Sequence, residues 1–545
     1  MGLLFIFIYE KTFSNIEQIE NQVEHVPIEN PVYKFLQRSE NMGLTYKSSL
    51  AKLPMQRKEV SKLLIQIKNN ESELNSFDKA TLNKYLREFH LVNVEDNTLI
   101  FSNSDTIQLI SDKLFSENEK YLYRLTDSEK TVSLRPLARM EIRKELNDSA
   151  RQSLLGTMGF RLYGNLDNSF GYYLQATNGS QFAGSKAYTL EDSRINENIK
   201  FTAYNSDIDF TESHIHYEKK WFNLSIGREN RLLGNGIGTK IYQSAFAPSS
   251  DALEIGAKFT GFHYYFTFAS VLANSDSLGK TGYLLKLPPK FIVTHRFSIR
   301  PEWGEIGFWE SIVFSDRFIE LGYLNPLSFF KSLEHALRDR DNSLVGWDFN
   351  VRPVKGLSIR GSYILDDIIF GFIGTGYWSN KAAMNLGAEY SSNLGFDIGA
   401  EYTRLEPYTF SHFNPVNAYT HDNRPFGSFL QPNSELWMLN MNFWLGSRYP
   451  LNLQMQYMRH GDNVYDSQGQ LVKNVGGSID QTIRFGIDSY NVTFLDGNLM
   501  KLFTLNLSWQ TELVRGFNLL ALIGVNNRNG KQQINSRLAI SFEDF

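Results

Sequence analysis

The chain has 545 residues, of which 42% are hydrophobic, 21% are charged and 14% are aromatic. Such a length exceeds one ordinary single-core domain, so the chain forms either several domains or one large closed sheet. Its 55 Lys and Arg residues against 59 Asp and Glu residues give a formal charge of -4, which argues against a nucleic-acid partner. The absence of cysteine excludes disulfides, thiolate metal sites and cysteine nucleophiles.

The N-terminal stretch Gly2–Tyr9, GLLFIFIY, resembles the apolar part of a secretory signal, and we expect residues 1–14 to be a signal remnant. No run of about 20 apolar residues occurs, so no membrane-spanning helix is predicted. The mean hydropathy of -0.32 does not exclude a membrane barrel, because strands that alternate apolar and polar residues cancel in the average.

A helical period runs from residue 30 to about 92. One helix is expected between Pro31 and Gly43, a second after Pro54 and a third from a cap at Ser76. The second has apolar residues at helical spacing, namely Val60, Leu63, Leu64 and Ile67, and the third has Leu82, Tyr85, Leu86 and Phe89. We therefore predict that residues 15–130 form a periplasmic helical bundle and a linker.

After Leu134 the period becomes two. One strand alternates Trp437, Leu439, Met441, Phe443 and Leu445 with Met438, Asn440, Asn442 and Trp444, and the next places Gln454 and Gln456 opposite an apolar face. The pattern continues for about 400 residues to the terminal Phe545. A soluble all-β array also alternates, but an open sheet of this length would leave edges to protect.

Closure into a barrel removes those edges and satisfies every backbone group in lipid. The fold predicted for residues 131–545 is therefore mainly β, a large antiparallel transmembrane β-barrel in the bacterial outer membrane, with about 16 to 18 strands at roughly 20 to 25 residues each. Short turns such as Thr260-Gly261, Leu394-Gly395 and Arg515-Gly516 are expected at one rim. Longer stretches, residues 272–290, 405–435 and 461–480, are expected at the other.

No motif nominates a catalytic set, a metal site or a cofactor, and we predict that the protein is not an enzyme. The run Gly234–Lys240 matches neither a phosphate loop nor a dinucleotide fingerprint. His214 and His216 share a strand face, but without a third ligand nearby they are expected to line the lumen. Asp339, Asp341 and Asn342 could bind calcium through their oxygen atoms, but the Gly and Glu positions of an EF-hand loop are missing.

The expected outer loops combine aromatic rings with hydrogen-bonding groups, a composition that suits sugar rings. The candidate polysaccharide-binding residues are Trp378, Tyr408, Tyr419, His421, Asp422, Asn423 and Arg424. Each aromatic among them could instead belong to the girdle at the membrane interface.

Four parts of the chain resemble the Wzi-like capsule assembly proteins of the outer membrane, in the form found in Bacteroidetes. They are VPIENPVYKFLQRSENMGL with LPMQRKEVSKLL and LNSFDKATLNKYLREF; GRENRLLGNGIGTKIYQSAFAPSSDALEI; IELGYLNPLSFF; and DRDNSLVGWDFNVRPVKGLSIRGSYILDD. Leu233-Gly234-Asn235-Gly236 departs from the Trp-Gly-Pro-like core common in that family.

The resemblance implies an 18-stranded barrel plugged or flanked by a periplasmic helical bundle. It also implies a lectin-like, non-catalytic role in holding capsular or other surface polysaccharide, with outer-membrane lipid and lipopolysaccharide as surroundings. Eight motif positions are expected to fix a network in the lumen: Glu320, Tyr323, Asn325, Asp341, Asn342, Asp348, Asp366 and Asp367. The alternative is a porin or uptake channel, since lumen amides fit either function, and an outer-membrane hydrolase ranks last. A weaker likeness of the helical segment to cell-wall-binding repeats suggests a peptidoglycan contact.

Overall fold

The computed structural model describes residues 22–92, 98–99, 114–126, 130–192, 195, 198–201, 206–274 and 287–543. The expected signal remnant at residues 1–14 and the terminal Phe545 lie outside these ranges. Within them, every helix is too short or too polar to cross a bilayer.

Three helices form near the N-terminus, as the helical period predicts: α2 (Val32–Asn41), α3 (Arg57–Asn69) and α4 (Ser76–Glu88). The cap of α4 is Asn75 and not Ser76, because the Asn75 side chain accepts a hydrogen bond from the Asp78 backbone N–H. The apolar stripes of the helices pack together with Trp444 into one buried cluster. Burial of these stripes, more than helix propensity, stabilises the bundle.

Eighteen strands of the described chain close into one antiparallel barrel, in which β28 pairs with β5. They are β5 (Lys130–Glu145), β6 (Gln152–Leu166), β7 (Phe170–Gly184), β9 (Ser206–Lys219), β10 (Phe222–Glu229), β12 (Ser250–Phe259), β13 (Phe262–Val271), β14 (Lys290–Ile299), β15 (Gly304–Ser315), β16 (Asn342–Val354), β17 (Leu357–Asp367), β18 (Lys381–Ser392), β19 (Phe396–Leu405), β22 (Ser434–Phe443), β23 (Leu451–Asp462), β26 (Asn498–Val514), β27 (Phe517–Arg528) and β28 (Lys531–Phe542). The predicted fold class is confirmed.

Shorter elements decorate the barrel. They are β1 (Lys52–Leu53) paired with β11 (Leu232–Leu233), β2 (Thr98–Leu99) with β3 (Lys120–Tyr121), β4 (Tyr123–Thr126), β8 (Ile199–Phe201), β20 (Thr420–His421) with β21 (Arg424–Pro425), β24 (Val464–Tyr465) with β25 (Leu471–Lys473), and helices α6 (Lys186–Leu190), α8 (Leu321–Leu324) and α9 (Phe330–Ala336). The last three interrupt the expected strand-and-turn pattern. They span 5, 4 and 7 residues, too few to show a helical period in the sequence.

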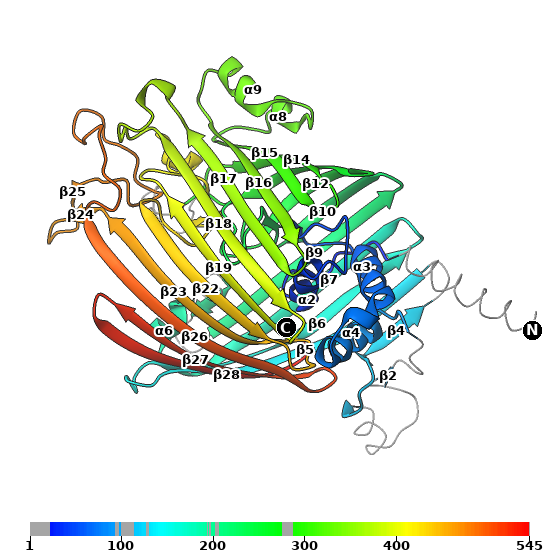
Figure 1. Cartoon of the computed structure of the whole chain (residues 1–545). Helices are drawn as coiled ribbons and strands as arrows, with labels where there is room; N and C mark the ends of the chain where they lie inside the picture. The colour runs from blue at the N-terminus through cyan, green and yellow to red at the C-terminus, as the bar shows by residue number, and fades with distance from the viewer. Residues whose placement is uncertain are drawn as a thin grey trace, which may run out of the picture.

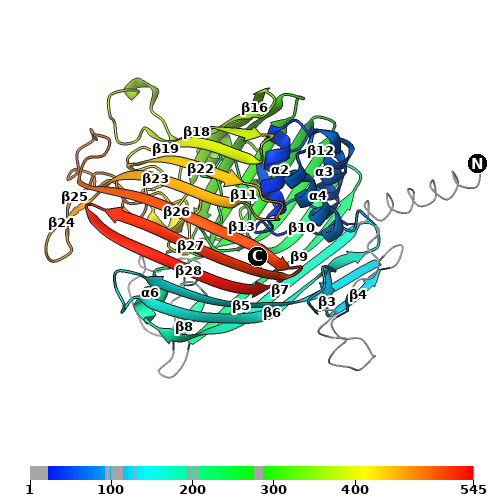
Figure 2. The same cartoon turned by 60° about the horizontal axis from the view of Figure 1, so that its bottom comes forward.

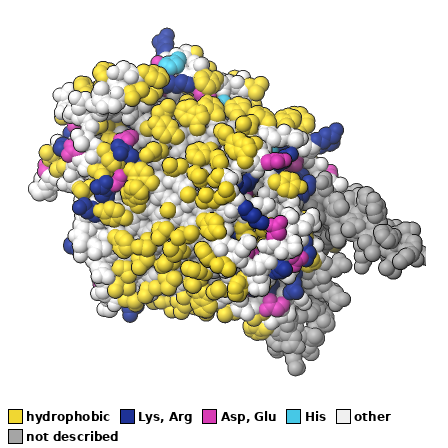
Figure 3. Space-filling model, viewed as in Figure 1, with side chains coloured by type: hydrophobic (Ala, Val, Ile, Leu, Met, Phe, Trp, Pro, Cys, Tyr) yellow, Lys and Arg dark blue, Asp and Glu magenta, His cyan; other side chains and the backbone are white. Residues whose placement is uncertain are grey.

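The two faces of each strand differ as the sequence predicts. The register pairs Trp437 with Tyr457 and Asn440 with Gln454 across β22 and β23, so apolar residues meet on one face and amides on the other. Trp437 is exposed, whereas Asn440 accepts a hydrogen bond from Asn452 inside the barrel. Hydrophobic side chains cover the outer wall (Figure 3). This exterior and the closed sheet are those of an integral outer-membrane barrel.

Long and short connections lie at opposite rims (Figures 1 and 2). At the short-turn rim, the Gly356 N–H donates to Asn41 O of α2, and Thr81 of α4 donates to Ser447 O. The three helices therefore occupy the mouth at this rim. The long connections, including those that carry β24, β25, α8 and α9, lie at the other end, as expected; residues 275–286 of the predicted stretch 272–290 are outside the described part.

Residues 316–341, here called the wall flap, fold back over the outside of the barrel. Their helices α8 and α9 pack Tyr323 and Phe330 against Phe266, Ile312 and Phe314, whose side chains point away from the lumen. This placement corrects the lumen position expected for four motif residues: Glu320, Tyr323, Asn325 and Asp341 belong to the flap. They lie outside because the apolar residues of the flap cover apolar wall residues that face outward.

Candidate functional site

The helical bundle bridges the mouth of the barrel by contacts to strands all around the ring. Arg38 of α2 forms a bidentate pair with Asp78 at 2.9 and 2.8 Å and a second ion pair with Asp397 at 2.6 Å. On another side of the ring, Lys52 of β1 pairs with Glu254 of β12 at 2.6 Å. These partners are nearly all buried, so the bundle is seated inside the barrel and closes it at this end.

A buried network of charges seals the same mouth near the seam between β28 and β5. Glu119 accepts hydrogen bonds from Arg515 at 2.5 and 2.6 Å and from Arg135 at 2.8 Å. Arg135 also pairs with Glu543 at 2.6 Å. Burial raises the pKa of the Glu119 carboxyl, but the charges of Arg515 and Arg135 outweigh burial and hold that pKa well below its usual range.

Two segments of the long-loop end, residues 230–249 and 406–433, fold into the lumen and are called the inner loops. They form an apolar core with the wall, in which the Tyr242 ring lies 3.9 Å from the Trp309 ring. Tyr419 donates to Tyr242 O at 2.9 Å, which joins one inner loop to the other. Lys290 of β14 donates to Ala418 O at 2.8 Å and fixes the second loop to the wall. The lumen is therefore filled from both ends over much of its section.

The glycine-rich run Gly234–Lys240 holds an anion, but that anion is a carboxylate of the barrel itself. Glu401 of β19 accepts hydrogen bonds from the backbone N–H groups of Ile237 at 2.6 Å, Gly238 at 3.3 Å and Thr239 at 2.8 Å. A Cβ at Gly236 would lie 2.1 Å from the backbone oxygen of Thr239, so the tight turn of this loop requires glycine at that position. These hydrogen bonds attach the inner loop 230–249 to the barrel wall. This structural role agrees with the mismatch between the run and nucleotide-binding motifs.

Lys240, the last residue of this run, is expected to make the stability of the fold depend on pH. Burial, with the nearby charge of Arg360, lowers the pKa of Lys240 from 10.5 to about 8. Because the folded state loses this proton at lower pH than the unfolded chain, stability rises between pH 8 and 10.5, by at most about 1.4 kcal/mol per pH unit. We expect Lys240→Met to lose that rise when unfolding by urea is measured in detergent micelles from pH 7 to 10. Parallel curves for the two proteins would contradict the assignment.

Several cavities remain inside the barrel, including one of about 320 Å³ between the bundle and the wall formed by β12, β13 and β14. Another cavity of about 500 Å³ lies between the bundle and the inner loops, lined by Lys34, Gln37 and Phe429 among others. A further one of about 240 Å³ lies along β5, β6 and β28, where Arg139, Arg161 and Arg537 line it. The amides Gln454 and Gln456 of the adjoining wall are half-buried. This polar side of the lumen is the feature a channel would use.

The predicted polysaccharide residues divide by burial. Tyr408, Tyr419 and His421 are buried, and His421 Nδ1 accepts the Leu272 N–H at 3.0 Å. Their rings serve the packing of the inner loops in this conformation, because each side chain is enclosed by its own chain. Trp378, Asp422, Asn423 and Arg424 keep exposed surface that a ligand can reach.

Trp378 belongs to a larger aromatic group that sequence reasoning did not assemble. We call the group the aromatic rim: Phe372, Tyr377, Trp378, Phe485 and Tyr490, from residues 368–380 and 463–497. The Trp378 ring lies 5.8 Å from Phe485, and the Tyr377 ring lies 4.6 Å from Phe372 and 6.4 Å from Tyr490. Phe372, Phe485 and Tyr490 are exposed. The two loops are distant in sequence and come together only in the folded barrel. The abundance of aromatic residues in each loop was therefore the one feature of the sequence that could have indicated this group.

The remaining motif positions face inward or lie at the long-loop rim. Asp348 accepts from Arg296 of the wall at 2.9 and 2.6 Å and from Asn235 of the first inner loop at 2.6 Å, and Asp366 accepts the Phe410 N–H at 2.6 Å. Asn342 donates to Asn417 O at 2.9 Å. These three tie inner loops and wall together. Asp367 accepts from Ser379 at 2.9 Å, beside the loop that carries Trp378.

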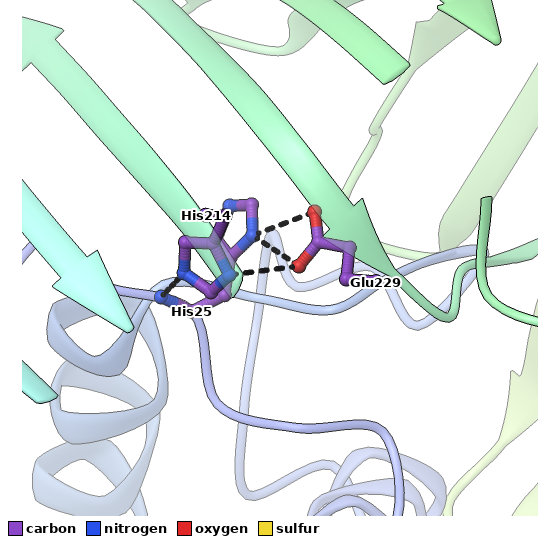
Figure 4. A group of neighbouring side chains, drawn as sticks. All are labelled: His25, His214 and Glu229. Atoms are coloured by element: carbon purple, nitrogen blue, oxygen red, sulfur yellow. Dashed lines mark hydrogen bonds and ion pairs between the residues drawn. The ribbon is translucent and has the colours of Figure 1, made fainter. Parts of the chain in front are cut away.

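A buried cluster of His25, His214 and Glu229 joins the N-terminal segment to β9 and β10 (Figure 4). His25 Nδ1 and His214 Nδ1 lie 3.0 and 3.3 Å from Glu229 Oε2, and the candidate ligand atoms lie within 4.8 Å of one another. The fold thus supplies the partners that the sequence did not place beside His214.

The hydrogen bonds of this cluster hold the N-terminal segment against β9 and β10. The His25 backbone N–H donates to His214 Nε2 at 3.2 Å, which puts the proton of a neutral His214 ring on Nδ1, toward the carboxylate. Arg231 contacts the other oxygen of Glu229 at 2.9 Å. A metal ion would have to displace these donors, since its ligands bind through deprotonated atoms.

The fold and its filled lumen define the class of protein: an 18-stranded outer-membrane barrel closed by its own helical bundle and inner loops. Among solved structures, the chain is similar to Wzi of Escherichia coli, described as an outer-membrane protein involved in group 1 capsule assembly and a carbohydrate-binding β-barrel. Identity is 12%, the TM-score is 0.57, and the match covers 95% of this chain and 99% of that one. The chain has the Wzi-type fold that its sequence resemblance implied.

Two Pseudomonas aeruginosa structures also match. OprD has 11% identity and a TM-score of 0.41, with 75% of this chain and 94% of that chain covered. OccK8 (OprE) has 10% identity and a TM-score of 0.44, with coverages of 76% and 97%. No protein-family model and no curated protein matches the chain.

Proposed function

We propose that this protein binds and anchors surface polysaccharide, such as capsule, at the outer face of the outer membrane, without catalysis. The observation that carries the proposal is the filled lumen. The bundle seals one mouth with buried ion pairs, and the inner loops fill the other half with an apolar core. A barrel that conducts solutes needs an open cross-section, whereas here packed side chains occupy much of the lumen. The carbohydrate binding of the similar Escherichia coli barrel agrees with the proposal.

The aromatic rim is the proposed binding surface. Its exposed rings can stack on the apolar faces of sugar rings, and Asp422, Asn423 and Arg424 supply hydrogen-bonding groups at the same end of the barrel. Each contact is weak, but a polymer offers many copies of the same unit. Retention therefore rises through multivalency rather than through one tight pocket.

The test combines binding and conductance on the purified barrel. In planar bilayers we expect no steady pore, and on a column of immobilised capsular polysaccharide from the source cell we expect retention. Trp378→Ala with Phe485→Ala should weaken retention about tenfold, since two stacking contacts contribute roughly 1.5 kcal/mol together. Tyr46→Ala, an exposed aromatic on the bundle at the opposite mouth, is the matched control.

The alternative function is a porin or uptake channel, favoured by the half-buried amide wall and the cavity beside Arg139, Arg161 and Arg537. Steady nanosiemens steps in the bilayer, with no retention of polysaccharide, would replace the anchoring function with transport. Retention that the double variant does not change would keep the function and remove the aromatic rim as its site.

A further inference from the structure

The wall flap, residues 316–341, exposes large apolar side chains that the barrel does not cover. Phe318 is 97% exposed, Leu327 is 83% exposed and Leu321 is 76% exposed. Soluble loops rarely expose a patch of this kind, which in general marks contact with a partner or a membrane. The flap lies on the outer wall, so the neighbouring surface is the apolar exterior of the barrel (Figures 1 and 3).

The flap is fastened at its base and along its length. Arg317 forms a bidentate pair with Asp341 at 2.8 and 2.6 Å, and Tyr323 donates to Asp341 at 2.8 Å. Tyr264 of β13 donates to Pro326 O. These contacts join both ends of the flap to each other and its middle to the wall, so its exposed side chains keep a fixed direction.

Beneath the flap lies a pair of polar residues on the outward face of the wall. His295 of β14 lies 2.9 Å from Glu310 of β15, and both are buried. Glu310 accepts the backbone N–H groups of Phe330 at 3.0 Å and Lys331 at 3.3 Å, at the start of α9. The Phe330 ring stacks on His295 with centroids 4.4 Å apart. Without the flap, this pair would face lipid, where ionisable side chains are strongly disfavoured.

The two sides of the flap differ in polarity. The exposed residues of α9 and its end are mostly polar and include Ser332, His335, Arg338 and Asp339. Figure 3 shows charged and His side chains at its top, where Figure 1 places α9, and hydrophobic side chains on the wall below. An element with an apolar side and a charged side suits the boundary between headgroups and acyl chains.

We propose that the wall flap is an in-plane membrane element whose Phe318, Leu321 and Leu327 insert among the acyl chains of the outer leaflet. The apolar surface of the flap continues the lipid-facing exterior of the barrel and ends in charged residues, so one lipid boundary covers both. The flap thereby anchors the long-loop rim to the leaflet and keeps lipid away from His295 and Glu310. This inference is independent of the polysaccharide function.

Because the chain contains no cysteine, single cysteines can report the surroundings of chosen positions without background. Leu327→Cys, Phe318→Cys and His335→Cys would each carry a nitroxide label in vesicles of phosphatidylethanolamine and phosphatidylglycerol. Ile226→Cys, on the outward face of β10, is the control for a lipid-facing site. Closure of each barrel is checked by its heat-dependent migration in gels.

We expect labels at 318 and 327 to relax faster with oxygen, as at 226, and the label at 335 to relax faster with a water-soluble nickel chelate. Access of the nickel chelate to 318 and 327 equal to that at 335 would overturn the proposal. Strong dipolar broadening at 327 that persists when vesicles contain few proteins would also overturn it, because a second copy would then cover the patch.

Discussion

Arg38→Met is expected to lower the free energy of unfolding by about 3–5 kcal/mol, because it leaves buried carboxylates without their cation. Arg38 is 1% exposed, and its guanidinium pairs with Asp78 of α4 and Asp397 of β19. It also donates to Ser392 O at 2.6 Å, at the turn into β19. The substitution keeps most of the side-chain volume, so the loss reports the charge network that holds the bundle in the mouth.

The measurement is urea unfolding in detergent micelles, followed by tryptophan fluorescence and by protease protection of residues 22–92. Lys355→Met is the matched control, since Lys355 and Glu73 form an exposed pair with 56% and 45% of their side chains accessible. Such a pair contributes only about 0–1 kcal/mol. If both variants unfolded at the same urea concentration, the bundle would not depend on the buried pairs.

Glu119→Ala is expected to cost about 3 kcal/mol, near the lower end for a broken buried network. Arg135 and Arg515 lose a shared carboxylate but keep Glu543 and Glu512 as partners at 2.6 and 3.1 Å. The remaining imbalance of buried charge lies beside the closing seam of the barrel. Glu73→Ala, from the exposed pair, is the matched control and should change stability by less than 1 kcal/mol.

Glu119 is also expected to make the free energy of unfolding depend on pH in the acidic range. Since the folded pKa of Glu119 is below the ordinary value of 4.5, its contribution is present above pH 4.5 and is lost as pH falls through the folded pKa. The difference between the natural chain and Glu119→Ala should therefore be largest near pH 7 and shrink below pH 4.5. A difference that is constant from pH 7 to pH 3 would show that Glu119 acts through packing alone.

The sequence alone determined the elements whose pattern is local. Residues such as Leu507 and Trp509 against Asn506 and Ser508 predict a strand with a lipid side and a lumen side, because strand side chains alternate by necessity. Helical stripes predicted α2, α3 and α4 for the same reason, and loop lengths predicted the two rims. The expected number of about 16 to 18 strands followed from the length of the strand-patterned region, and closure followed from the edges that an open sheet of this length would expose.

Only the tertiary structure decided what fills the lumen and what faces outward among the loops. Tyr419 and His421 have the composition of a sugar site, yet they are buried because residues 406–433 turn inward. Tyr323 and Asp341 were expected in the lumen and lie on the outer wall. The aromatic rim unites two loops about 100 residues apart. A loop has no period, so its direction depends on which distant surface it can bury, and that is settled only when the whole barrel has closed.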